Sequence, residues 1–421
     1  METKSKTNIF FIYNFLLLLS SLNTATYLFL LPTNSVTANL SIFVNIFRLY
    51  ISVLFLPCMK EFKLNILPLN KWLDFSDRPL IISGPCSAES RDQLVNTAKA
   101  LAETGIVKIF RAGLWKPRTR PDSFEGVGIR GFEWLKEMKA LTGMLTAVEV
   151  ANPEHIEQCI KHEIDILWIG ARTTVNPFSI QEIAEALKGT DMPVMVKNPV
   201  NPDIRLWLGA LERINNAGIC KLIAIHRGFY AYDSKPYRNA PIWDIPIELM
   251  RLCPELPLIC DPSHISGNLQ LLESVSQKAL DLEMQGLMIE THINPSKALS
   301  DNKQQLTPKG FSELISKLVI RNNFSDNAEF KTKLEELRSQ IDTNDAEMLR
   351  LLSKRMKIVE QIGNYKKDNN ITILQIKRWN NIIKESLIFG NKLGLDKEFL
   401  IKLLRVIHEE SIKKQTEIFK K

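Results

Sequence analysis

A cysteine follows an apolar run in the stretch LIISGPCSAES at residues 80–90, at the point where a strand would end. A cysteine in this position is either a small buried hydrophobic residue or a ligand that faces a site. Three further residues with metal-binding side chains follow or end similar runs: His264, Glu290 and Asp301. Together with Cys86 they would offer one sulfur, one nitrogen and two carboxylate donors. That set suits a divalent transition metal such as Mn, Fe, Co or Zn and fits Mg or Ca poorly.

Basic residues accompany this set. Six of them stand near the ends of predicted strands: Arg111, Lys116, Arg118, Arg172, Lys197 and Arg227. So many cations would repel one another unless the bound ligand were strongly anionic, which favours phosphates and carboxylates. Taken singly, each residue has a plainer explanation, because a lone cysteine is usually core and a lone Arg or Lys is usually a surface charge. A functional role is favoured because all of these residues would come together at one site.

The segments that must position these side chains alternate between short β-rich runs and amphipathic, helix-like stretches. Eight strands are predicted, at residues 79–84, 106–113, 145–150, 166–170, 193–198, 221–228, 256–261 and 286–292. Eight such units indicate an α/β fold of the (β/α)8 TIM barrel type, in which catalytic groups collect at the carboxyl ends of the strands. A closed barrel would therefore bring the candidate residues onto one rim.

Seven motifs carry a resemblance to a known family. GPCSAES, KPRT, GART, MVKNP, HRG, DPSH and ALSDNKQQL, in that order, resemble the type I-beta branch of 3-deoxy-D-arabino-heptulosonate 7-phosphate (DAHP) synthase over about residues 64–320. The resemblance implies a metal-dependent condensation of phosphoenolpyruvate with erythrose 4-phosphate, the first step of the shikimate pathway. The main rival within the fold, 3-deoxy-octulosonate 8-phosphate synthase, carries KANR where this chain has KPRT at 116–119.

The same resemblance implies a role for each matching residue. The metal ligands would be Cys86, His264, Glu290 and Asp301. Phosphoenolpyruvate would be held by Arg111, Lys116, Arg172, Lys197 and Arg227. Arg118 and Thr119 would bind the aldose phosphate. Apart from the resemblance, the chemistry needs groups that move protons, for which Lys116 or His292 is a candidate, and Glu149 is a candidate orienting carboxylate. Two departures from the family pattern are Arg120, where Ser is frequent, and IHRG in place of CERG.

The C-terminal part reads as a separate all-helical domain. Residues 321–331 are polar and predict a linker, and apolar residues then recur at helical spacing through a long helix. Two more helices are predicted at about 374–389 and 396–419, which suggests a three-helix bundle that dimerises to close its core. Arg355 and Lys366 lie eleven residues apart, about 20° from the same face and about 16 Å along the axis.

These cations have two interpretations. They are either snorkelling residues at the edge of a coiled-coil dimer or the anion-binding groups of a pocket. Arg338 points roughly 100° away, so it would reach the pocket of a partner chain more easily than its own. LRSQID, KRMKIVEQIGNYK, ILQIKRW and EESIKKQ resemble the all-helical chorismate mutase family. Matching residues would line its chorismate pocket: Arg338 from the partner, Arg355, Lys366, Gln375, Arg378, Ser411 and Gln415. Gln375 stands where relatives often have Asp, and Trp379 replaces a frequent Glu.

The sequence thus predicts a bifunctional enzyme with a barrel at 59–320, a linker at 321–331 and a mutase domain at 332–421. In the alternative, the barrel is the only enzyme and the tail is a dimerising module that senses prephenate or chorismate. We expect a homodimer or homotetramer, feedback by prephenate, and no aromatic amino acid effector.

Composition and the N-terminal sequence narrow the expected partners and the expected cellular location of the protein. The net charge is +7, but neither a zinc-finger spacing nor an aromatic-interleaved basic patch is present, so nucleic acid is not an expected partner. Six scattered cysteines argue against a disulfide scaffold and fit a cytoplasmic location. The apolar residues 1–58 read as a signal or membrane anchor, or as translated DNA upstream of a true start at Met59, which is the interpretation we favour.

Overall fold

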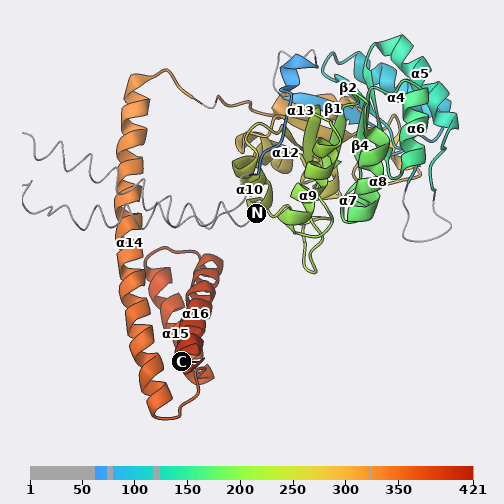
Figure 1. Cartoon of the computed structure of the whole chain (residues 1–421). Helices are drawn as coiled ribbons and strands as arrows, with labels where there is room; N and C mark the ends of the chain where they lie inside the picture. Colours follow the sequence, from blue (N-terminus) through green and yellow to red (C-terminus); the bar gives the residue numbers. More distant parts are fainter. Residues whose placement is uncertain (1–61, 74–78, 117–123, 323, 421) are drawn as a thin grey trace, which may run out of the picture. The chain divides into compact units, whose positions relative to one another are not determined.

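The structure is a computed structural model that describes residues 62–73, 79–116, 124–322 and 324–420 (Figure 1). It divides into two compact units, one ending at Arg321 and the other beginning at Asn322, and each is described by itself. Within the described ranges, no helix combines the length and the apolar character needed to cross a membrane. The predicted extension or anchor at residues 1–58 lies outside the described residues.

The first unit is a closed barrel of eight parallel strands in sequence order. The strands are β1 (Leu80–Gly84), β2 (Ile109–Arg111), β3 (Leu145–Val150), β4 (Ile166–Ile169), β5 (Val194–Lys197), β6 (Leu222–His226), β7 (Leu258–Cys260) and β8 (Gly286–Glu290). The barrel closes where β1 pairs with β8, in a register that sets Gly84 opposite Glu290. The predicted barrel is confirmed, and every predicted strand contains an observed one.

Alternate residues of each strand face opposite sides of the barrel wall. Leu80 and Ile82 belong to an inner apolar core, whereas Ile81 packs in the larger core between strands and helices. The inner core also contains Ile109, Ala147, Ile166, Trp168, Met195, Ile223, Ile225, Ile259 and Met288. Continuing this alternation to the carboxyl ends of the strands brings a polar set to the inner side: Arg111, Glu149, Lys197, Arg227, Asp261 and Glu290.

Helices surround the strands and bury their apolar faces against the outer side of the wall. They are α4 (Arg91–Ala102), α5 (Arg130–Thr142), α6 (Pro153–Lys161), α7 (Ala171–Thr174), α8 (Pro177–Leu187), α9 (Ile204–Asn216), α10 (Asp244–Leu252), α11 (Pro262–Ser266), α12 (Leu272–Asp281) and α13 (Pro308–Lys317). Side-chain caps such as Ser90 on α4 and Asn152 on α6 accept backbone N–H bonds, which fixes where those helices begin.

The amino ends of the strands are covered by the segment around the 3-10 helix η1 (Leu69–Lys71). Leu69 and Leu73 belong to the inner core, and the Leu67 N–H donates to the Cys220 carbonyl just before β6 at 2.9 Å. The inner core is therefore closed on this side. A substrate site inside the barrel has to open at the opposite rim, where the polar set lies.

The second unit consists of three helices, as predicted: α14 (Ala328–Asp368), α15 (Ile376–Lys392) and α16 (Lys397–Lys420). Helix α16 packs against both α14 and α15. Gly363 lets α14 approach α16 closely, because a Cβ there would lie 2.8 Å from Ile418 Cδ1. Along α14, large apolar side chains stay exposed, including Leu337, Ile341, Met348, Ile358 and Ile362.

Candidate active sites

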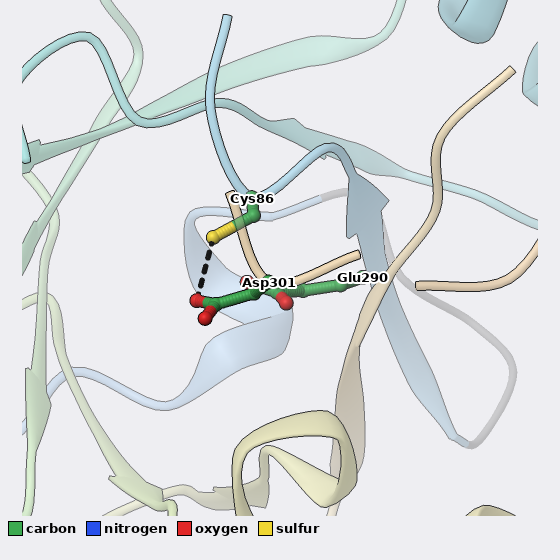
Figure 2. Close-up of side chains that lie close together, drawn as sticks. All are labelled: Cys86, Glu290 and Asp301. Carbon is green, nitrogen blue, oxygen red and sulfur yellow. Dashed lines mark hydrogen bonds between the residues drawn. The ribbon is translucent and has the colours of Figure 1, made fainter. Parts of the chain in front are cut away.

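The rim of the barrel brings together a thiol and two carboxylates. Cys86 follows β1, Glu290 is the last residue of β8, and Asp301 lies in the loop after the 3-10 helix η2 (Pro295–Lys297). One donor atom from each lies within 4.8 Å of the other two, and the Cys86 thiol donates to Asp301 Oδ2 at 3.1 Å (Figure 2). Asp301 has a positive φ of 47°, a strained conformation that is common at functional sites.

His264, the fourth predicted ligand, lies beside this cluster, on α11 after β7. Its Nε2 is 3.8 Å from Glu290 Oε1, and its Nδ1 is 2.8 Å from Asp261 Oδ2. A carboxylate behind one ring nitrogen orients a histidine so that the other nitrogen can bind a metal. The structure therefore groups three of the four predicted ligands tightly and places the imidazole next to them.

The electrostatics of the cluster fit a bound divalent cation. Burial raises the pKa of the Cys86 thiol to about 12, and the Glu290 charge adds to the rise, so a thiolate here needs a cation beside it. Glu290 Oε1 is buried and makes no hydrogen bond to the described residues, although Arg111 Nη2 is 3.1 Å away. Burial opposes ionisation of Asp301, but His264 and Arg238 outweigh it and hold its pKa below the usual range. Sulfur, nitrogen and carboxylate donors in one place are a typical transition-metal set.

Three of the predicted cations lie at the same centre. Arg111 is fully buried, and the Lys197 ammonium donates to Asp261 Oδ2 at 2.7 Å. Both cations lie over the Trp168 ring, 4.9 Å and 5.9 Å from its centroid. Lys116 Nζ donates to Cys86 Sγ at 3.0 Å. This arrangement leaves the rim rich in positive charge and able to bind small anions.

The remaining predicted groups are placed as follows. Arg227 is buried after β6, and burial lowers its pKa to about 10. Arg172 is exposed on α7. Glu149 is half-buried and lies against Gly170, where a Cβ would be 2.2 Å from Glu149 Oε1. Gly170 therefore leaves room for that carboxylate. Arg118, Thr119 and Arg120 lie outside the described residues.

The sequence-based reasoning missed three groups at this rim. Asp261 contacts both Lys197 and His264, and its position directly after β7, in step with the inward-facing Ile259, was a usable signal. Burial opposes its ionisation, but His264 and Lys197 hold its pKa well below the usual range. Arg238 donates to Asp301 Oδ1 at 3.0 Å from a long loop, where no pattern marks it. Gln304 donates to Glu290 Oε2 at 2.7 Å.

His226, beside Arg227, faces the opposite side of the wall. Its ring lies near Trp243 and Phe229, with centroids 5.1 Å and 5.7 Å away. Burial lowers its pKa to about 3, so the imidazole is neutral. His226 is a packing residue of the helix layer rather than a member of the site.

The helical unit gathers a second candidate site between α14 and α16. Arg355 Nη1 donates to Ser411 Oγ at 2.7 Å, and Gln415 is buried one turn further along α16. Gln415 Oε1 makes no hydrogen bond to the described residues. Lys366 donates to the Ile373 carbonyl. It also borders a hollow of about 630 Å³ that Ile362, Tyr365 and Gln375 help to line.

Two predicted residues of the second site are exposed, and one is distant. Gln375 and Arg378 lie on the surface at the start of α15. Arg338 pairs with Glu335 at 3.7 Å and lies on the same straight helix as Arg355, about 25 Å away by helical rise. The ring of Trp379 stacks on His408 with centroids 3.9 Å apart, a contact that the sequence-based reasoning did not anticipate.

A closed (β/α)8 barrel that carries a metal-type cluster and buried cations at its carboxyl rim belongs to the class of barrel enzymes for small anionic substrates. Residues 74–322 match the model of the DAHP synthetase I family, and residues 337–416 match the model of chorismate mutase type II. The chain therefore belongs to the DAHP synthetase I family and carries a chorismate mutase domain in its helical unit. Both predicted resemblances are confirmed.

The relatives of this chain include enzymes of both candidate reactions, and the heptonate aldolase has the higher identity. Phospho-2-dehydro-3-deoxyheptonate aldolase of Thermotoga maritima is 35% identical over 238 residues, which span 56% of this chain and 68% of that protein. Its crystal structure has a TM-score of 0.51 at 34% identity and covers 56% of this chain and 67% of its own. The 2-dehydro-3-deoxyphosphooctonate aldolase of Desulfotalea psychrophila is 26% identical over 259 residues, or 57% of this chain and 88% of that protein.

Proposed function

We propose that this chain is a bifunctional shikimate-pathway enzyme. Its barrel condenses phosphoenolpyruvate with erythrose 4-phosphate to DAHP and phosphate, and its helical unit rearranges chorismate to prephenate. The observation that carries the first activity is the cluster of Cys86, Glu290 and Asp301 beside buried Arg111 and Lys197 in a barrel of this family. The second activity rests on the mutase match and on the Arg355–Ser411 contact.

Different residues of the barrel would bind the two anionic substrates and activate the reacting carbonyl. Arg111, Lys197 and Arg227 would neutralise the phosphate and carboxylate of phosphoenolpyruvate, together with Lys116 and Arg172. Arg118 and Thr119 would take the phosphate of the aldose. A divalent metal held by Cys86, His264, Glu290 and Asp301 would supply Lewis-acid polarisation of the aldehyde. We leave Mn, Fe, Co and Zn open, because the donor set admits all four.

We assign the proton transfer to Lys116, with His292 as the alternative. Burial opposes its charge, but its pairing with Cys86 and the charges of Glu149 and Glu290 outweigh burial and raise its pKa, so Nζ stays an ammonium. When C3 of phosphoenolpyruvate attacks the aldehyde, Lys116 Nζ would give a proton to the oxygen that becomes the hydroxyl. Water then adds at C2 and phosphate leaves.

The helical unit needs no nucleophile, because its reaction is a pericyclic rearrangement. Arg355 and Arg378, with Arg338 from a second copy of the chain, would hold the two carboxylates in a compact conformer. Lys366 and Gln415 would stabilise charge on the breaking ether oxygen, and Ser411 would orient Arg355. The exposed apolar residues of α14 support pairing of two helical units in a homodimer or homotetramer.

One set of assays tests both activities and their alternatives. Phosphoenolpyruvate loss is followed with erythrose 4-phosphate or arabinose 5-phosphate, first with a chelator and then with metal restored. Loss only with the four-carbon sugar, and only with metal, supports the synthase. Preference for arabinose 5-phosphate would favour the octulosonate reaction instead. Chorismate loss in the same preparation separates a working mutase from a module that only senses chorismate or prephenate.

Because one chain carries two steps of one pathway, we infer feedback regulation: prephenate bound by the helical unit slows the synthase reaction of the barrel. We expect this regulation to operate in the cytoplasm. The measurement is the synthase rate of the full chain with added prephenate, at a concentration that saturates the mutase. An unchanged rate would exclude this regulation. Arg355→Ala is the matched variant, because it should remove both prephenate binding and the inhibition.

A further inference from the structure

Two adjacent glutamines in the loop after β8 contact different candidate ligands. Gln304 Nε2 donates to Glu290 Oε2 at 2.7 Å, and Gln305 Oε1 accepts from the Cys86 N–H at 2.9 Å. Each of the two side chains is only 1% exposed. Neither glutamine is a metal ligand in the proposed function. Their side chains nevertheless hydrogen-bond to Glu290 and to the backbone of Cys86, which are two of the four proposed ligands.

The backbone explains why neighbours point to different ligands. The Leu306 N–H donates to the Glu290 carbonyl at 3.0 Å, and the His292 N–H donates to the Leu306 carbonyl at 2.9 Å. The segment thus runs as a short parallel bridge beside the end of β8. Gln304 ends a turn, in which its N–H donates to the Asp301 carbonyl at 3.2 Å, whereas Gln305 leads into the bridge at Leu306, so the two side chains start from different backbone conformations and reach different ligands.

Other partners fix the orientation of both amides. Gln304 Oε1 accepts from Arg238 Nη1 at 2.6 Å, so its amide nitrogen has to face Glu290. The same Arg238 nitrogen donates to Asp301 Oδ1 at 3.0 Å. Gln305 Nε2 donates to the Ser300 carbonyl at 2.8 Å, which ties Cys86 to the residue before Asp301.

A second contact reinforces the tie made by Gln305. Ser87 Oγ and Ser300 Oγ are 2.7 Å apart and buried, and each serine is the chain neighbour of a predicted ligand. The loop after β1 and the loop after β8 are therefore joined on both sides of the Cys86–Asp301 contact. Gln304 occupies Oε2 of Glu290 and leaves Oε1 without a hydrogen bond, 3.8 Å from His264 Nε2.

We propose that Gln304 and Gln305 are a pair of positioning residues for the metal site, each setting a different ligand. Gln304 orients the Glu290 carboxylate, and Gln305 sets the Cys86 sulfur against Asp301. The inference rests on the proposed function, in that it takes the cluster to bind a divalent metal. Removing either contact should weaken metal binding about 10–100-fold, the usual effect of losing a partner behind a ligand.

Titration of the metal-free full chain with Co(II) separates the two roles, because the sulfur-to-cobalt charge-transfer band reports the Cys86 bond once any band that remains in Cys86→Ala is subtracted. Gln305→Met keeps the size of the side chain and removes both hydrogen bonds, so we expect weaker binding and a diminished band. Gln304→Met should weaken binding and leave the band in place. Gln305→Glu keeps an acceptor for the Cys86 N–H and should retain the band. Gln270→Met, at an exposed glutamine, is the matched control.

The outcomes are distinguishable. If wild type binds no Co(II), or binds it without the sulfur band, the proposed metal site itself fails. If wild type shows the band and both methionine variants match it in affinity and intensity, the positioning proposal alone fails. Equal loss of the band in Gln305→Met and Gln305→Glu would mean that the acceptor for the Cys86 N–H does not set the sulfur, which would contradict the role given to Gln305. Thermal midpoints of the metal-free variants, compared with Gln270→Met, identify any variant that is misfolded.

Discussion

The two units solve the problem of holding anions in opposite ways. At the barrel rim Arg111 and Lys197 are buried and paired within one chain, as Lys197 is with Asp261. In the helical unit Arg338 and Arg378 are exposed, and apolar side chains line the outside of α14. A barrel converges on its own axis, so one chain completes the site. A three-helix unit has no such common axis, and the pocket that we propose for it takes Arg338 from a second copy.

The strongest test of this comparison is to inactivate one site and measure the activity of the other. Cys86→Ala removes the sulfur donor and a partner of Lys116 and Asp301, so synthase activity should fall by about a thousandfold or more. Mutase activity should be unchanged, because Cys86 belongs to the other unit. Phosphoenolpyruvate and chorismate consumption are measured on one preparation, with Cys220→Ala as the control. A parallel fall in both rates would contradict independent sites.

The reciprocal variant is Arg355→Ala. It removes a charged donor from a preorganised pocket, so the mutase rate should fall by roughly 10²–10³-fold. The synthase rate without prephenate should stay within twofold of wild type. Lys357→Ala, an exposed cation two residues away, serves as the control and should leave both rates alone. If Lys357→Ala lost as much mutase activity as Arg355→Ala, general charge rather than a specific contact would be responsible.

A smaller effect tests how closely the barrel rim is packed. In Gly170→Ala the new Cβ would lie 2.2 Å from Glu149 Oε1, so that carboxylate has to move. We expect a roughly 10-fold loss of synthase kcat/KM with the mutase unaffected. Gly209→Ala is the matched control, because nothing lies within 4 Å of its Cβ and it sits inside α9. That control should gain up to about 1 kcal/mol in stability from helix propensity.

Low pH should destabilise the barrel of the metal-free protein through Asp261. The pKa of Asp261 in the folded barrel is held well below the usual range. As pH falls, this carboxyl is therefore protonated in the unfolded chain before it is protonated in the folded barrel. Its contribution to stability is complete above an unfolded pKa of about 3.9 and declines below it, by up to about 1.4 kcal/mol per pH unit. Urea midpoints of the barrel, followed between pH 6 and 3, should fall less steeply below pH 4 in Asp261→Asn. An identical slope would assign the acid sensitivity to other groups.

Much of the fold was predictable because strand and helix periods are local signals. The two-residue alternation of each strand also separates Arg227, which faces the site, from His226, which faces the helices. Arg238 was beyond reach, because it comes to Asp301 from a loop whose path no pattern fixes. Gln304 and Gln305 were hidden for another reason: neutral amides at a charged site read as ordinary loop residues until their contacts are known.

The closure of the barrel has a consequence for how the protein folds. The contacts at the β1–β8 seam join residues that are very far apart in sequence: 215 for Cys86 and Asp301, 219 for Cys86 and Gln305, and 213 for Ser87 and Ser300. Forming them requires closing the longest loop in the unit, which carries the largest entropic cost. Cys86 therefore meets Asp301 only when the first and last strands have joined, so an ion bound at the proposed metal site would stabilise the closed barrel.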